Sequence, residues 1–194
     1  MNTPTTTATA TAAAHEALFG DALSCHELRP AAFLPGALDA AAVQSLGARG
    51  EALLRALAVV EDGARNEEPE QPADHAVHRI EAKLDLLTAL VASLATSHDA
   101  DPSRELQWSS HGACLAVDEP LAIGATGRFR VQPADWLPSP LLLPATVLAC
   151  DAGLDGQPRA WLRFGPLSPP LEAALERHLF RVHRRAVAES RRPR

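Results

Sequence analysis

The clearest pattern in the sequence is a heptad repeat of apolar residues, in which spacings of three and four residues alternate. The seam consists of Val77, Ile80, Leu84, Leu87, Val91 and Leu94. Two apolar positions per heptad lie on one helical face and favour a coiled coil. We therefore expect a helix from Asp74, its N-cap, to about Thr96 that joins copies of the chain. A monomeric hairpin folded on the rest of the molecule is the alternative, and the mixed seam residues do not fix the number of chains.

A second helical segment precedes the heptads. Residues Ala40 to Val60 are rich in strong helix formers, with Asp39 as a plausible cap and apolar positions that follow helical spacing once Gly50 is included. Residues 61–72 are acidic and contain two prolines, which predicts a loop. Residues 37–98 are therefore expected to form a helical hairpin. Leu86 and Leu90 lie beside the seam, where the first helix can cover them.

After residue 100 the apolar period changes to two, which is typical of half-buried strands. The short runs are Glu105–Ser109, Ala113–Val117, Gly127–Gln132, Leu142–Cys150 and Arg159–Phe164. An amphipathic helix from Pro170 to about Glu189 follows. Strands at this spacing predict a small antiparallel barrel over residues 103–190, with the helix closing one end. The fold class is α+β.

The N-terminal residues carry a weaker signal. Residues 1–17 are rich in Thr and Ala, so we expect a disordered tail. Residues 18–36 mix apolar side chains with turn formers and end at Pro35-Gly36, which predicts an extended arm or a short strand.

Charge and composition exclude several classes of protein. The net charge of −6 argues against a general nucleic-acid binder. The segment from Arg177 to Arg194 is nevertheless basic, and it is either a solvated helix face or a surface for an acidic partner, a phosphate or a membrane. His75 and His78 lack a third metal ligand, and the three cysteines form no CxxC pair, so no metal or other cofactor is expected. No window of 18 apolar residues predicts a transmembrane segment, and the expected location is the cytoplasm.

Several motifs in the C-terminal half resemble the PilZ domain family. They are Leu106-Gln-Trp-Ser-Ser-His-Gly-Ala-Cys-Leu115, Gly124-Ala-Thr-Gly127-Arg-Phe-Arg-Val131, the strand Ala145–Cys150 and Arg159-Ala-Trp-Leu-Arg-Phe-Gly-Pro-Leu167, followed by the Leu- and Arg-rich helix. PilZ domains are small bacterial barrels, many of which sense cyclic di-GMP. A barrel preceded by heptad helices resembles an atypical subgroup that assembles tetramers and has a degenerate nucleotide motif.

The resemblance also defines a candidate nucleotide site. The family binds cyclic di-GMP with an RxxxR arm and a (D/N)xSxxG motif, whose counterpart here has Gln107, Ser109 and Gly112. Gln107 stands where Asp or Asn is expected, and no RxxxR precedes it. The loss of two charge-assisted partners, at about 1.5–3 kcal/mol each, predicts weak or lost binding. Ser109 and Gly112 then serve as turn residues that the barrel needs.

The resemblance implies a non-enzymatic adaptor of cyclic di-GMP signalling, a homotetramer that affects motility, type IV pili, biofilm or virulence through a signalling or pilus-assembly protein. The alternative is a genuine cyclic di-GMP receptor that uses Arg29 or the C-terminal arginines. A barrel for single-stranded nucleic acid is a third possibility, but the 4% of aromatic residues and the acidic charge argue against it. No catalytic residues are expected, because the adjacent Ser110 and His111 would point to opposite faces of a strand.

Overall fold

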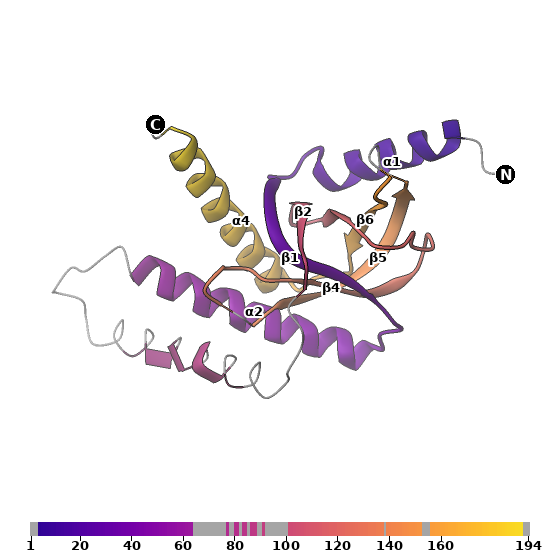
Figure 1. The fold of residues 1–194 in the computed structure, drawn as a ribbon. Helices are drawn as coiled ribbons and strands as arrows, with labels where there is room; N and C mark the ends of the chain where they lie inside the picture. The colour runs from indigo at the N-terminus through magenta and orange to yellow at the C-terminus, as the bar shows by residue number, and fades with distance from the viewer. Residues whose placement is uncertain are drawn as a thin grey trace.

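The computed structural model describes residues 4–63, 101–137, 139–152 and 156–191, together with residues 77, 80, 81, 83, 84, 86–88 and 91. Its strands are β1 (Cys25–Pro35), β2 (Ser103–Trp108), β3 (Gly112–Ala116), β4 (Thr126–Val131), β5 (Leu141–Asp151) and β6 (Arg159–Phe164). They close into an antiparallel barrel in the order β1-β2-β3-β6-β5-β4 (Figure 1). The predicted barrel is confirmed, and every strand expected after residue 100 is present.

Strand β1 closes the barrel from the N-terminal side of the chain. Its first half, Cys25 to Pro30, pairs with β2, and its second half, Ala31 to Pro35, pairs with β4. Pro30 lies where the strand leaves one neighbour for the other, a position at which its missing N–H does not interrupt a ladder. The predicted arm is therefore a full barrel strand, and the barrel is not contained in residues 103–190.

The barrel interior is apolar. In β4, Phe129 and Val131 are fully buried, while the alternating Arg128 and Arg130 point outward. Phe129 packs between Trp108 and Phe164, with ring centroids 6.4 Å and 5.3 Å apart. These contacts follow from the period-two pattern of the sequence, because alternate side chains of a strand point to the same face.

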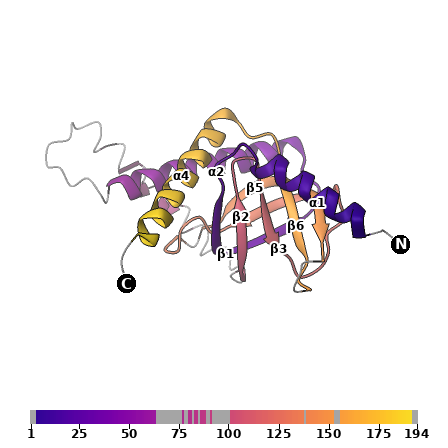
Figure 2. The same ribbon diagram turned by 90° about the horizontal axis from the view of Figure 1, so that it is seen from above.

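Two helices cover one end of this core, α2 (Ala40–Gly63) and α4 (Pro169–Ser190) (Figures 1 and 2). The Asp39 carboxylate accepts a hydrogen bond from the Ala42 N–H at 2.7 Å, which confirms the predicted cap. Ser168 caps α4 in the same way. The helices pack on each other, α2 also packs on β5, and α4 packs on β1. Their apolar faces join the barrel interior in one hydrophobic core.

A further helix, α1 (Pro4–Phe19), occupies the segment for which composition predicted a disordered tail. That prediction is wrong for most of residues 1–17. Ala14, Leu18 and Phe19 are buried against the outer surface of the barrel. Tertiary packing thus offsets the low helix propensity of the threonines, as is usual for short helices.

The heptad segment is described only in part. Its described residues are helical and are drawn beside α2 in Figure 1. Leu86 is buried and belongs to the main core, whereas Val77, Ile80, Leu84, Leu87 and Val91 are between 51% and 63% exposed. Asp74, His75, His78, Leu90, Leu94 and the predicted loop after Gly63 lie outside the described residues. None of the described helices has the length and apolarity needed to span a membrane.

Candidate nucleotide-motif surface

Gln107 lies on the outer face of the barrel. Its neighbours Leu106 and Trp108 are buried, and it pairs with His26 of β1 and Cys114 of β3. Its side-chain amide donates a long hydrogen bond of 3.4 Å to the Ser24 hydroxyl. The motif residue that should read a guanine edge therefore faces solvent, beside a surface groove.

This groove has a volume of about 440 Å³ and runs over β1, β2, β3 and β6. Its polar lining includes His26, Glu105, Gln107 and Arg159. Arg159 donates to the Glu105 carboxylate at 3.0 Å. A phosphate would have to compete with Glu105 for the only arginine that lines the groove in the described part of the chain.

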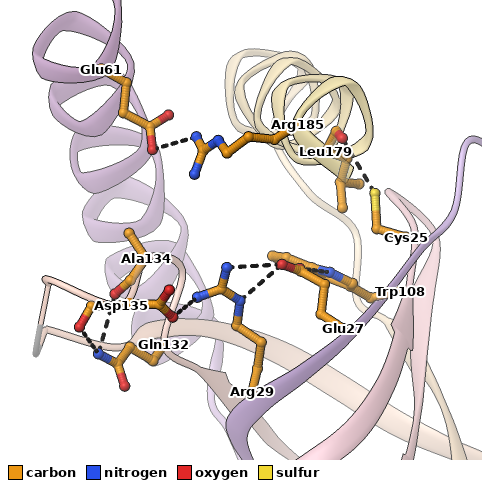
Figure 3. A network of polar contacts seen from close by, with 10 residues as sticks. All are labelled: Cys25, Glu27, Arg29, Glu61, Trp108, Gln132, Ala134, Asp135, Leu179 and Arg185. Carbon is orange, nitrogen blue, oxygen red and sulfur yellow. Dashed lines mark hydrogen bonds and ion pairs between the residues drawn. The ribbon is translucent and has the colours of Figure 1, made fainter. Parts of the chain in front are cut away.

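Arg29 points to the other side of β1. His26, Glu27 and Leu28 of β1 line the groove. Arg29 does not line it, because alternation along the strand places the Arg29 side chain on the face opposite His26 and Leu28. The Arg29 guanidinium bonds Glu27 at 2.9 Å and also bonds Asp135 (Figure 3). The structure therefore does not bring Arg29 to Gln107.

Ser109 and Gly112 form the turn between β2 and β3. The Ser109 N–H donates to the Gly112 carbonyl at 2.9 Å, and the Ser109 hydroxyl accepts from the His111 N–H at 3.0 Å. The same hydroxyl donates to the Leu18 carbonyl of α1 at 2.6 Å, and Ser109 is fully buried. A Cβ at Gly112 would come within 2.1 Å of the Leu162 carbonyl oxygen, so the position requires glycine. Both residues are engaged in turn formation and in contacts with α1.

Two arginines of α4, Arg181 and Arg185, are paired with α2. Glu61 accepts from Arg181 at 3.1 Å and from Arg185 at 2.9 Å (Figure 3 shows the Arg185 contact). Glu27 accepts from Arg29 and from the Trp108 indole N–H at 3.0 Å. Glu61 thus links α2 to α4, and Glu27 links two residues of the barrel strands β1 and β2.

His178 lies in this region and was not singled out by the sequence. It is 1% exposed, and its ring meets Trp108 edge-on at 5.6 Å. Burial, together with Arg181, Arg29 and Arg185, lowers the pKa of His178 from 6.5 to about 3. Its spacing from Leu171, Leu175 and Val182 places it on the apolar stripe of α4, and this signal could have revealed it.

Two of the three thiols, those of Cys25 and Cys114, are buried. The Cys25 thiol donates to the Leu179 carbonyl at 3.3 Å, and burial raises its pKa to about 11. Burial likewise raises the pKa of Cys114 to about 12. Neither is a thiolate at neutral pH, which a nucleophilic cysteine would have to be. Among the described residues, no group of three His, Cys, Asp or Glu side chains could hold a metal ion.

The closed barrel, its glycine turn and the flanking helices define a PilZ-type domain. A family model described as an atypical PilZ domain, cyclic di-GMP receptor, matches residues 54–192. The chain belongs to the atypical PilZ domain family.

One solved structure supports this assignment. The chain is 43% identical to a pathogenic protein from Xanthomonas campestris, over 93% of this chain and 98% of that chain, with a TM-score of 0.74. That protein is described as a tetrameric PilZ domain self-assembled via an unusual helical bundle. The PilZ domain of YcgR from Escherichia coli, solved with cyclic di-GMP, is 19% identical over 46% of this chain and 78% of its own, with a TM-score of 0.38. No curated protein matches the chain.

Proposed function

We propose that this protein is a non-enzymatic, oligomeric adaptor of cyclic di-GMP signalling in the bacterial cytoplasm. In this proposal it assembles through the seam and presents its barrel to a protein partner. The observation that carries the proposal is the contrast between Leu86, which is buried, and the five described seam residues, which are more than half exposed.

The exposed seam supports self-assembly. Complete burial of a Val, Leu or Ile side chain contributes about 1.5–3 kcal/mol of favourable free energy. A single chain gains only part of this free energy at its five half-exposed seam residues, and association with another chain would supply more. Exposed apolar rows of this kind mark interaction sites in soluble proteins. The Xanthomonas relative self-assembles through a helical bundle. We infer that this chain forms a homotetramer in the same way.

The groove supports weak or absent nucleotide binding. Of the three motif residues, only Gln107 lines the groove. The arginine that lines the groove, Arg159, is already paired with Glu105. Arg29 points away from the groove and is paired with Glu27. This pairing argues against the alternative hypothesis, in which Arg29 binds cyclic di-GMP. An RxxxR arm would add two charge-assisted contacts of about 1.5–3 kcal/mol each, and the groove has no counterpart among the described residues.

The adaptor role follows from these two inferences together. A family member that keeps its barrel but has lost its nucleotide contacts can still act through protein contacts. We propose that its partner is a signalling or pilus-assembly protein and that its output is motility, type IV pilus function, biofilm or virulence. The description of the Xanthomonas relative as pathogenic is consistent with such an output.

The mass in solution tests the proposal. Light scattering of the parent should give a multiple of the 20.6 kDa chain, and Leu84→Asp should reduce it to one chain because a charge cannot be buried in the seam. The matched control Thr88→Asp places the same charge on an exposed position of the same helix beside the seam and should keep the parental mass. A parental mass for Leu84→Asp would remove the coiled-coil claim.

A titration of the parent with cyclic di-GMP by calorimetry tests the second part of the proposal. We expect no heat of binding at micromolar concentrations of protein and nucleotide. A sub-micromolar affinity would instead make the chain a direct receptor.

A further inference from the structure

Helix α1 lies across the outer surface of the barrel, over β3, β5 and β6 (Figure 2). Its contact forms a second apolar cluster, distinct from the main core. The buried members are Ala14, Leu18 and Phe19 from the helix and Cys114, Ala149 and Trp161 from the strands. The helix is therefore attached to the outside of a barrel whose interior is complete without it.

Only the C-terminal part of α1 makes this attachment. Residues 8–10, 12 and 13 are exposed, and the buried side chains begin at Ala14. The exposed part alternates Thr with Ala, and Thr is a poor helix former. Helices of this length are marginal in isolation. The helicity of α1 thus depends on the docking of three side chains.

The docked end of α1 covers two residues of the nucleotide motif. The Leu18 carbonyl, in the last turn, has no helical partner and accepts from the Ser109 hydroxyl at 2.6 Å. A Cβ at Gly112 would come within 2.7 Å of the Leu18 side chain. Ser109 and Gly112 are therefore both in contact with Leu18 and unavailable to another molecule.

One polar group of this cluster has no partner in the described part of the chain. The indole N–H of Trp161 is buried, and it has no hydrogen-bond partner among the described residues. If α1 moved away, water or a ligand could accept from this donor. Buried polar groups are normally paired, so this one favours the open state.

From this geometry we propose that α1 is a removable cover on the motif surface. Docked, it uses the Ser109 hydroxyl as its own C-terminal cap and closes off Trp161 and Cys114. Undocked, it exposes an apolar face with two free donors, the Ser109 O–H and the Trp161 N–H. Any molecule that uses this face of the barrel must first displace α1. The proposal does not depend on oligomerisation.

Hydrogen exchange of the full chain tests the cover directly. Amides of residues 14–19 should exchange at least ten times faster than those around Leu175 and Leu179, which are in the main core. Ser109→Ala removes the cap and should speed exchange in α1 by about threefold to tenfold, the factor that one hydrogen bond is worth, with no change in α4. The control Ser110→Ala removes a neighbouring buried hydroxyl that makes no contact with Leu18 in the described structure and should leave α1 unchanged. Equal exchange rates in α1 and α4, or equal acceleration of both, would overturn the proposal.

Thiol labelling gives an independent measurement. Cys114 lies under α1, whereas Cys25 lies under α4 and reports opening of the main core. Leu18→Ala should increase the rate of Cys114 alkylation about tenfold and leave that of Cys25 unchanged. Two rates that rise together would mean that α1 is part of the global fold, and an unchanged Cys114 rate would mean that α1 does not cover it. Either result contradicts the proposal. If Leu18→Ala does not fold, Ser109→Ala serves as the labelling variant.

Discussion

The barrel interior and the heptad helix are built from the same types of aliphatic residue, yet these residues are buried in the barrel and exposed at the described seam positions of the helix. Leu141, Leu143 and Leu162 are completely buried, whereas Leu84 and Leu87 are 56% and 57% exposed. The barrel buries its apolar side chains because its strands close on themselves. In the described part of the heptad helix, Leu86 is buried in the main core, whereas the five seam residues stay more than half exposed. The barrel, α2 and α4 bury their core within one chain, whereas the proposed assembly would cover the seam with another chain.

Helix α2 connects these two regions. Leu54 and Leu57 are fully buried in the main core, and Leu86 from the heptad helix joins the same core. Glu61, near the end of α2, bonds two arginines of α4. An assembly made through the seam would therefore be coupled to each barrel through Leu86, which packs in the same core as α2.

The largest expected effect comes from the barrel interior. Phe129→Ala removes a fully buried ring that packs between Trp108 and Phe164. The free energy of unfolding should fall by about 3–5 kcal/mol, as in other large-to-small core replacements. Urea denaturation followed by circular dichroism measures it. A loss below 1 kcal/mol would show that the barrel interior is less tightly packed than its burial indicates.

The next test compares two adjacent leucines. Leu86→Ala should lower the free energy of unfolding by about 2–5 kcal/mol, because Leu86 is buried in the core of its own chain. Leu87→Ala should leave that free energy nearly unchanged at low protein concentration and instead raise the concentration at which the assembly dissociates. Light scattering over a dilution series and urea denaturation separate the two effects. Identical behaviour of the two variants would remove the distinction between core face and seam.

The sequence predicted the barrel from a period of two, and it predicted the seam, which stays a prediction, from the heptads. Period two in Gly127–Gln132 places Phe129 and Val131 inside, and the heptads place Leu86 outside the seam row, next to α2. These patterns survive in the structure because each reports which face of an element is apolar. The pairing of β1 with both β2 and β4 is a long-range property, and no local pattern encodes it.

The candidate site was harder to predict for two physical reasons. The sequence did not fix a strand through Arg29, so its placement on the face opposite Gln107 was not foreseen. Ser109 matched a nucleotide motif, but a hydroxyl is equally suited to cap a helix, and α1 was not expected to be a helix. The buried side chains that dock α1 are few, and a Thr- and Ala-rich composition does not reveal them.

Acidification should weaken the contact between α4 and the barrel through His178. Its pKa is lowered from 6.5 to about 3, so between these values the unfolded chain binds a proton that the folded chain does not. The stabilisation that comes from burying neutral His178 is fully present above pH 6.5. Below that pH, the free energy of unfolding falls by about 1.4 kcal/mol for each unit by which the pH drops toward 3. His178→Leu should lose less stability between pH 7 and pH 5 than the parent. The control His183→Leu, on the exposed side of α4, should follow the parent, and coincident curves for all three would mean that His178 does not carry this dependence.

The smallest expected effects on stability come from replacing two glycines of α2, which lie at different distances from the core. A Cβ at Gly47 would lie 3.9 Å from Leu171, an ordinary contact, so Gly47→Ala should stabilise the protein by about 0.5–1 kcal/mol through helix propensity alone. A Cβ at Gly50 would lie 3.2 Å from Leu141 and 3.4 Å from Leu171, close enough that these side chains must shift. Gly50→Ala should therefore gain less than Gly47→Ala or lose stability, because the barrel packs α2 tightly at that point. Thermal denaturation of the two variants, both in the Leu84→Asp background so that assembly does not contribute, measures the difference. Equal increases in stability for the two variants would show that the core side chains beneath α2 can shift at little cost. The difference in packing between the barrel and the seam would then be smaller than the exposed fractions of their side chains indicate.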